Sequence, residues 1–258
     1  MKLRGGKGKD GSEGGAAEAP APAERKPEPP PVIDEAERAR MFELIKARHS
    51  VYKYTDRPIE PEVRAELDAF IAEVNEREGY RIQAFYDEPE CFDSRLAHDF
   101  SGVRNYVALV GPNDERLEMH MGYAGQEVVL KAQELGLNTC WVFAGHGKSK
   151  TEVPKKHREV AVIALGYGEN QGEGHKMKPV EKVSNYEEGM PPWFLDGVEA
   201  ALLAPASTTD QRFRIELRPD GTVTAYVKFS LHADVDLGIK VCNFEKASGW
   251  KVARGVRM

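Results

Sequence analysis

The sequence has 258 residues, a formal net charge of −6 at pH 7 and a pI of about 5.7. This acidic balance gives no basic stripe of the kind that nucleic acid requires, and no apolar run approaches the roughly 18 residues of a membrane span. The start of the chain lacks the apolar core of a standard signal peptide. We therefore expect neither nucleic acid nor a membrane as a partner.

The cysteines and histidines favour neither a disulfide framework nor a metal site. Cys91, Cys140 and Cys242 are isolated, and they fit no CxxC spacing. The seven histidines form no His-x3-His or HExxH pair. Unpaired cysteines are typical of a reducing compartment, so we expect a cytoplasmic protein.

Both ends of the chain differ from its middle. Residues 1–32 are rich in Gly, Ala, Pro and charged residues, and they have almost no large apolar side chain. Such a segment buries too little surface to offset its ordering entropy, so we expect a disordered tail. The globular domain should cover residues 33–250, and residues 251–258 should form a C-terminal tail.

The first elements follow from caps and periodicity. Asp34 is a suitable N-cap for a helix that ends near Arg48. Pro61 starts a second helix, whose apolar residues recur with the helical period until Gly79. Residues 80–86 alternate as a strand, and the almost continuous apolar run 105–110 predicts a strand buried on both faces.

A long helix is predicted over residues 114–135, followed by strands at 139–143 and 160–165. Gly122 and Gly125 lie within one turn of this helix, and interior glycine costs about 1 kcal/mol each. They indicate close approach of another backbone or of a flat ligand. The alternative is that this segment is an ordinary buried core helix with no role in binding.

The last third has a similar order of elements. A helix starts after Pro191, strands at 211–217 and 223–229 flank a turn at Pro219, and residues 232–247 are again helical. Gly125 and Gly136 are 11 residues apart, as are Gly238 and Gly249. We predict an internal duplication, with repeat one at about 33–183 and repeat two at about 184–250.

A short basic run at the end of the first helix is the first candidate binding segment. Arg48, His49 and Ser50 place a guanidinium, an imidazole and a hydroxyl close to a helix terminus. A phosphate monoester favours a fixed cation that can bond two oxygens beside short neutral donors. The alternative is a solvated basic helix end, where cations meet the helix dipole favourably.

A small, hydroxyl-rich turn, Ala204-Pro205-Ala206-Ser207-Thr208-Thr209-Asp210-Gln211, is the second candidate segment. It follows the end of another predicted helix. The functional interpretation requires that this turn and the run at Arg48 share one ligand.

The continuation of the first run, Arg48-His49-Ser50-Val51-Tyr52-Lys53-Tyr54, resembles the FMN-dependent nitroreductase family. Members carry such a run after the first helix, then an acidic residue, a proline and the second helix. Tyr52 stands where the family has a second cation, which removes one charged phosphate contact.

Two later segments extend the resemblance. The stretch 122–142 looks like the family's central helix and the strand after it, so the backbone of Phe143 and Ala144 should border the flavin ring. Lys178, in a basic-proline-acidic segment, corresponds to a cation that reaches the phosphate. The alternative, to which we give equal weight, is that Lys178 is a solvated lysine in a loop.

The turn at 204–211 resembles the family's Ala-Pro-Ser-x-x-Asn-x-Gln turn. Pro205 and Gln211 match, Ala206 takes the serine position with Ser207 beside it, and Thr209 replaces the asparagine. In most members this turn follows the second helix and serves the partner's flavin. Here the turn falls in the second repeat. In this respect the chain resembles a branch of the family in which one chain contains two degenerate repeats and imitates the dimer.

The resemblance implies an α+β fold: a nitroreductase-like three-layer α/β/α sandwich with a mixed, mainly antiparallel sheet, internally duplicated. It implies a monomer that binds one FMN, takes reducing equivalents from NADH or NADPH, and reduces a small molecule such as a nitroaromatic, quinone or activated alkene. It requires no catalytic acid or base. The implied FMN site consists of Arg48, His49, Ser50, Tyr52, Phe143, Ala144, Lys178, Pro205, Ala206, Ser207 and Thr209. The alternatives are an FMN-binding protein without turnover and a cofactor-free scaffold.

Overall fold

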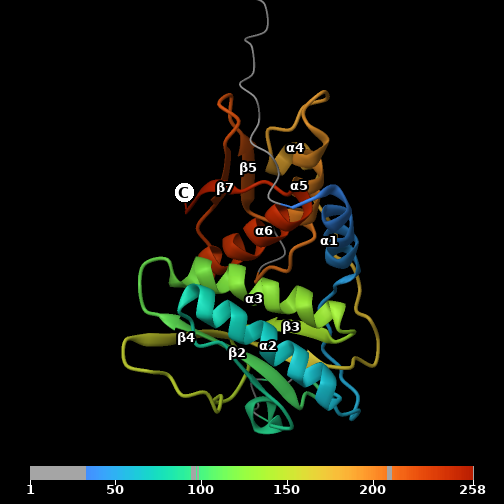
Figure 1. The fold of residues 1–258 in the computed structure, drawn as a ribbon, viewed down its shortest axis with the longest axis vertical. Coiled ribbons are helices and arrows are strands. Elements are labelled where there is room, and N and C mark those ends of the chain that lie inside the picture. Colours follow the sequence, from blue (N-terminus) through green and yellow to red (C-terminus); the bar gives the residue numbers. More distant parts are fainter. Residues whose placement is uncertain (1–32, 94–96, 98, 208–210, 258) are drawn as a thin grey trace, which may run out of the picture.

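The computed structural model describes residues 33–93, 97, 99–207 and 211–257 (Figure 1). The helices are α1 (Glu35–Ala47), α2 (Pro61–Glu78), the short 3-10 helix η1 (Pro89–Phe92), α3 (Leu117–Glu134), α4 (Val180–Val183), α5 (Pro192–Leu202) and α6 (Ala233–Ser248). The strands are β1 (Gln83–Phe85), β2 (Asn105–Pro112), β3 (Asn138–Val142), β4 (His157–Gly166), β5 (Phe213–Leu217), β6 (Val223–Val227) and β7 (Val252–Arg257). The tail expected at residues 1–32 lies outside these ranges.

In the described part of the chain the strands form two sheets and not one mixed sheet, whereas the expected mainly antiparallel pairing is confirmed. One sheet has the order β1-β2-β4-β3 and is antiparallel throughout. The other has the order β5-β6-β7, with β6 antiparallel to β5 and parallel to β7. The C-terminal tail expected at 251–258 is corrected as well, because residues 252–257 form β7 and pair with β6.

The predicted helix boundaries have the expected local causes. The Asp34 side chain accepts a hydrogen bond of 2.8 Å from the Glu37 N–H and so caps α1. Pro61 occupies the first turn of α2, and Gly79 ends that helix in the left-handed conformation at a φ of 73°. In the described part of the chain, no helix combines the length and the apolar character that crossing a bilayer requires.

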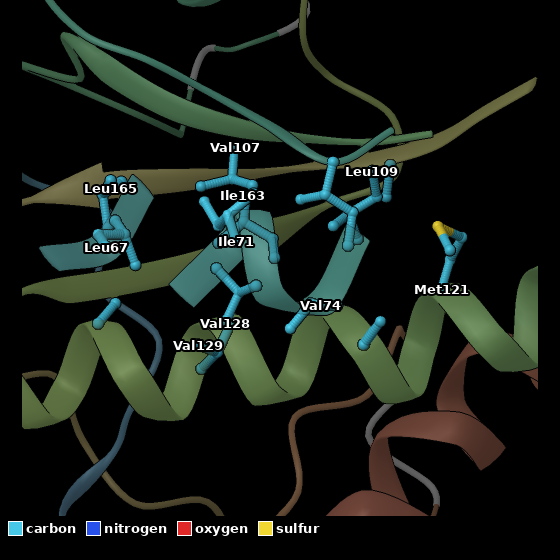
Figure 2. Packing of buried hydrophobic residues seen from close by; sticks show 14 of the residues in the cluster. Leu67, Ile71, Val74, Val107, Leu109, Met121, Val128, Val129, Ile163 and Leu165 are labelled. Atoms are coloured by element: carbon cyan, nitrogen blue, oxygen red, sulfur yellow. The ribbon is translucent and has the colours of Figure 1, made fainter. Parts of the chain in front are cut away.

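The main core lies on one face of the four-stranded sheet. Strand β2 is buried along nearly its whole length, as its apolar run predicts. Helices α2 and α3 cover this face with interdigitating apolar side chains (Figure 2). The labelled contributors are Leu67, Ile71 and Val74 from α2, Val107 and Leu109 from β2, Met121, Val128 and Val129 from α3, and Ile163 and Leu165 from β4. This packing fixes the position of β3, which borders the candidate site.

Helices α3 and α6 pack against each other between the two sheets (Figure 1). A Cβ on Gly122 would lie 2.1 Å from the carbonyl oxygen of Val235, and a Cβ on Gly238 would lie 2.0 Å from that of Met119. Only glycine permits backbones to approach this closely. Of the two possibilities for Gly122, the structure selects the approach of another backbone.

These contacts are reciprocal and define a register between the helices. Gly238 follows Gly122 by 116 residues, and Val235 follows Met119 by the same number. The glycines that end the helices, Gly136 and Gly249, are instead 113 residues apart, and both have a φ of 77°. The offset of 116 residues at the contact and the offset of 113 residues at the helix ends differ by three residues, which is close to one helical turn. The segment from the contact glycine to the terminal glycine is therefore about one turn longer in α3 than in α6.

Candidate functional site

A cavity of about 1020 Å³ lies where the end of α1, strand β3, the loop after β4 and the turn after α5 meet. Nine predicted site residues line it: Arg48, His49, Ser50, Tyr52, Phe143, Ala144, Pro205, Ala206 and Ser207. The two candidate segments therefore face one cavity, although they are about 155 residues apart in sequence.

One predicted residue does not join this lining. Lys178 is not among the lining residues, although it contacts Gln211, which is one of them. Its backbone N–H donates to Gln211 Oε1 at 2.8 Å, and its Nζ donates to the Gln211 carbonyl oxygen at 3.3 Å. These bonds hold the lysine against the last residue of the turn. Thr209 lies outside the described residues.

Backbone pairing positions the segment after α1. The helix ends because Arg48 adopts an extended conformation, with φ −77° and ψ 120°. The Val51 N–H then donates to the Thr139 carbonyl of β3 at 3.1 Å, and the Tyr54 N–H donates to the Ser101 carbonyl at 2.9 Å. Val51 and Tyr54 are buried. The segment is therefore fixed along β3, with Ser50 and Tyr52 at the cavity.

Arg48 is a buried cation at the cavity. Only 4% of its surface is exposed, and its Nη2 donates to the Leu203 carbonyl at 3.2 Å. Among the described residues, its Nε has no hydrogen-bond partner and no carboxylate forms an ion pair with the guanidinium. Burial lowers the pKa of Arg48 to about 10, which leaves it protonated near neutrality. An anion in the cavity would compensate this charge.

Two histidines lie beside Arg48 in the lining. His175 Nε2 is 2.9 Å from the Leu202 carbonyl oxygen and donates to it, because a carbonyl only accepts. Burial, reinforced by the charges of Arg48 and His175, lowers the pKa of His49. Asp99 and Glu173 also line the cavity, so its surface carries both signs of charge.

The hydroxyl-rich turn is held by side chains from other elements. Ser207 donates its N–H to Asp236 Oδ1 at 3.0 Å. Its Oγ lies 3.1 Å from Asp236 Oδ2 and 2.9 Å from the Leu231 carbonyl oxygen. Gln211 donates through Nε2 to the Leu202 carbonyl at 3.4 Å. The turn is thus tied both to α6 and to the end of α5.

Three aromatic rings stack in series at the cavity wall. The centroids of Trp141 and Phe143 are 5.8 Å apart at 16°, and those of Phe143 and His232 are 4.5 Å apart at 18°. The Trp141 Nε1–H donates to Gln126 Oε1 at 3.4 Å. A Cβ on Gly125 would lie 2.5 Å from the Trp141 ring. Gly125 therefore makes room for an aromatic side chain and not for a ligand or a second backbone.

Sequence reasoning missed several lining residues: Phe100, Cys140, Trp141, Gly172, His175, Leu231 and His232. One signal was available, because a glycine-rich loop follows the buried strand β4. Its Gly172 has a φ of 72°, and a Cβ there would lie 2.6 Å from the Ser50 carbonyl oxygen. The left-handed conformation of His232, with a φ of 59°, has no counterpart in the sequence pattern.

Comparison with solved structures finds similar folds. A "putative nitroreductase" from Thermotoga maritima matches with a TM-score of 0.59 at 20% identity, covering 80% of this chain and 82% of that one. A "putative nitroreductase" from Desulfovibrio desulfuricans in complex with FMN gives 0.46 at 20% identity, over 58% of this chain and 98% of that one. An FMN-dependent nitroreductase from Clostridium difficile R20291 gives 0.41 at 16% identity, over 58% and 94%.

The first of these matches establishes an α+β nitroreductase-like fold with mainly antiparallel sheets. At such identities the likeness concerns the fold alone. No protein among the curated sequences matches significantly. The sequence model of a family described as "Putative TM nitroreductase" matches residues 40–248. Because this match spans most of the sequence, the chain belongs to the TM nitroreductase family.

Proposed function

We propose that this chain binds one FMN in the cavity and passes reducing equivalents from NADH or NADPH to a small acceptor such as a nitroaromatic, a quinone or an activated alkene. The observation that carries the proposal is Arg48, a buried guanidinium that lines the same cavity as the hydroxyl-rich turn and pairs with no carboxylate in the part of the chain that the structure describes. Membership of the nitroreductase family supports flavin chemistry in particular.

The residues at the cavity fit the parts of FMN. A volume of about 1020 Å³ is at the upper end of the ~300–1,000 Å³ of typical ligand pockets. The guanidinium of Arg48 suits a phosphate oxygen, and the backbone at Phe143 and Ala144 suits the edge of a flat ring. FMN supplies the redox chemistry when bound, and the protein supplies binding and orientation.

Tyr52 is the departure that most affects this function. It stands in place of a second cation, is 48% exposed, and lies 5.3 Å from the Phe100 ring centroid. Its hydroxyl is a neutral donor, so phosphate binding would depend more heavily on Arg48. This departure favours a second candidate function, an FMN-binding protein without turnover.

The visible spectrum of the purified protein, with and without added FMN, tests the cofactor. We expect flavin absorbance that remains after gel filtration. Steady-state oxidation of NADH and NADPH with nitroaromatic, quinone and alkene acceptors then tests turnover. A yellow protein inactive with every acceptor would favour the binder. A colourless protein that takes up no FMN would leave only a cofactor-free scaffold.

We also propose that the chain contains two degenerate repeats and functions as a cytoplasmic monomer. The reciprocal contacts of Gly122 and Gly238 support the duplication, because a two-fold axis between equivalent helices generates such pairs. A chain that supplies both segments of the cavity does not need a partner to complete it. The three cysteines are unpaired, as in a reducing compartment.

A further inference from the structure

Asp236 is a buried carboxylate in the first turn of α6, one residue layer behind the cavity. It is 4% exposed and is not part of the cavity lining. Both of its carboxylate oxygens lie within hydrogen-bond distance of Ser207, which does line the cavity. Burying a carboxylate costs free energy, so its place behind a candidate binding residue calls for an explanation.

The hydrogen bonds of Ser207 determine what its hydroxyl offers to the cavity. A serine hydroxyl has one proton and two lone pairs. Two acceptors stand within reach of that proton, Asp236 Oδ2 at 3.1 Å and the Leu231 carbonyl oxygen at 2.9 Å. Neither an ionised carboxylate nor a carbonyl donates in return. The proton is therefore directed into the protein, and Ser207 Oγ keeps its lone pairs for the cavity.

The surroundings of Asp236 supply partial compensation for its charge. Lys240 follows one turn later on α6, is itself buried, and donates to the Asp236 backbone carbonyl at 3.3 Å. The carboxylate also lies in the first turn of a helix, where the dipole favours negative charge. These groups offset part of the cost of burying the ionised carboxylate, the form that only accepts hydrogen bonds.

We propose that Asp236 is a positioning residue: its carboxylate keeps the Ser207 hydroxyl proton turned away from the cavity, so that Ser207 Oγ accepts a hydrogen bond from a ligand N–H or O–H group. The inference rests on the proposed function, which supplies FMN as the ligand. FMN has two kinds of suitable donor, the imide N–H of its ring and the hydroxyls of its ribityl chain.

The substitution Asp236→Asn tests this role with little change in shape. The asparagine Oδ1 retains the bond to the Ser207 N–H, whereas its Nδ2 donates to Ser207 Oγ and occupies a lone pair. We expect a threefold to tenfold loss of FMN affinity, measured by quenching of flavin fluorescence. Ser207→Ala should lose a similar amount, and Ser207→Thr, which retains the hydroxyl, should stay closer to wild type.

Analogues of FMN separate positioning from a purely structural effect. Titrations with 3-methyl-FMN, which lacks the imide N–H, and with 2′-, 3′- and 4′-deoxy analogues identify the donor that wild type recognises. In wild type, FMN should bind more tightly than the analogue that lacks this donor, and Asp236→Asn should reduce that ratio of affinities at least threefold. A structural defect would instead weaken the binding of FMN and of every analogue equally. Asp220→Asn, at an exposed turn outside the cavity lining, is the control and should behave as wild type.

Three results would count against the inference in distinguishable ways. Wild-type protein that takes up no FMN overturns the proposed function, and this inference with it. Wild-type protein that binds FMN while Asp236→Asn leaves every affinity unchanged overturns the inference alone. Equal weakening of FMN and all analogues in Asp236→Asn shows a structural tie and also overturns it.

Discussion

Arg48 concentrates the chemistry of the candidate site in one side chain. A charge this deeply buried is normally balanced by a carboxylate, and here the direct partner is the Leu203 carbonyl. Among the described residues no carboxylate balances this charge, and burying it without one is costly to the free protein. A bound phosphate would recover that cost, so the side chain couples ligand binding to the stability of the fold.

Arg48→Ala should weaken FMN binding tenfold or more, because a charged hydrogen bond contributes about 1.5–3 kcal/mol. Arg48→Met retains most of the packing and should lose affinity equally, while the melting temperature of the free protein stays the same or rises. Arg57→Ala, which removes an exposed arginine paired with Glu60, is the control and should leave affinity unchanged. Unchanged flavin affinity in Arg48→Ala would reject Arg48 as the anchor.

Asp236 predicts a pH dependence of stability. Burial raises its pKa above the ordinary 3.8, although Lys240, the Ser207 hydrogen bonds and His232 oppose the shift. The folded state therefore binds the proton more tightly than the unfolded state. Stability contributed by this group is present below pH 3.8 and is lost as the pH rises through the raised pKa.

Asp236→Asn removes that titration. Relative to wild type, the variant should gain stability between pH 4 and pH 7, as measured by denaturant unfolding at both values. A variant that instead loses relative stability over this interval would show that the folded protein favours the ionised carboxylate.

The site residues that the sequence predicted are those carried by local motifs. Arg48, His49 and Ser50 are consecutive, and Pro205, Ala206 and Ser207 form one turn. His175, His232 and Trp141 reach the cavity only through tertiary packing, which no local pattern encodes. Lys178 shows the converse, because its basic-proline context gave no indication that Gln211 would bind it.

At the level of secondary structure, the close packing of α3 against α6 is the contact whose loss should most affect stability. Gly122→Ala and Gly238→Ala should each destabilise the protein by about 1–3 kcal/mol, because each new Cβ meets a backbone carbonyl oxygen that cannot move aside. The two costs should be similar, since the contacts are reciprocal. Glu73→Ala, on the exposed side of α2, should change stability by less than about 0.5 kcal/mol.

Denaturant unfolding of these variants provides the measurement. A cost well below 1 kcal/mol for either glycine would mean that the helices can separate easily, which contradicts the close approach.

Elements with strong local signals were predictable, and pairings between strands were not. Helices α1 and α2 have an N-cap or a proline, and β2 has a continuous apolar run. Strand β7 mixes glycine and arginine with apolar residues, which is a weak pattern for a strand. In sequence, the whole of α6 separates β7 from its parallel partner β6. Periodicity defines a strand but not its neighbours, which is why one sheet was expected where two exist.

The molecule as a whole should be a monomer that binds one flavin. Both walls of the cavity come from one chain, so sedimentation equilibrium should give the mass of a single chain of 28.7 kDa, with and without FMN. Flavin titration should reach saturation at one equivalent. An obligate dimer, or a stoichiometry of two, would contradict this arrangement.

The hydrogen bond from Arg48 to Leu203 joins residues separated by 155 positions in sequence. Contacts of such long range form late, after most loop-closure entropy has been lost. During synthesis or refolding, we therefore expect the chain to complete the proposed phosphate-binding corner only when its last third has docked. Flavin uptake would then mark the final step of maturation, and a truncated or half-folded chain would remain unable to acquire the cofactor.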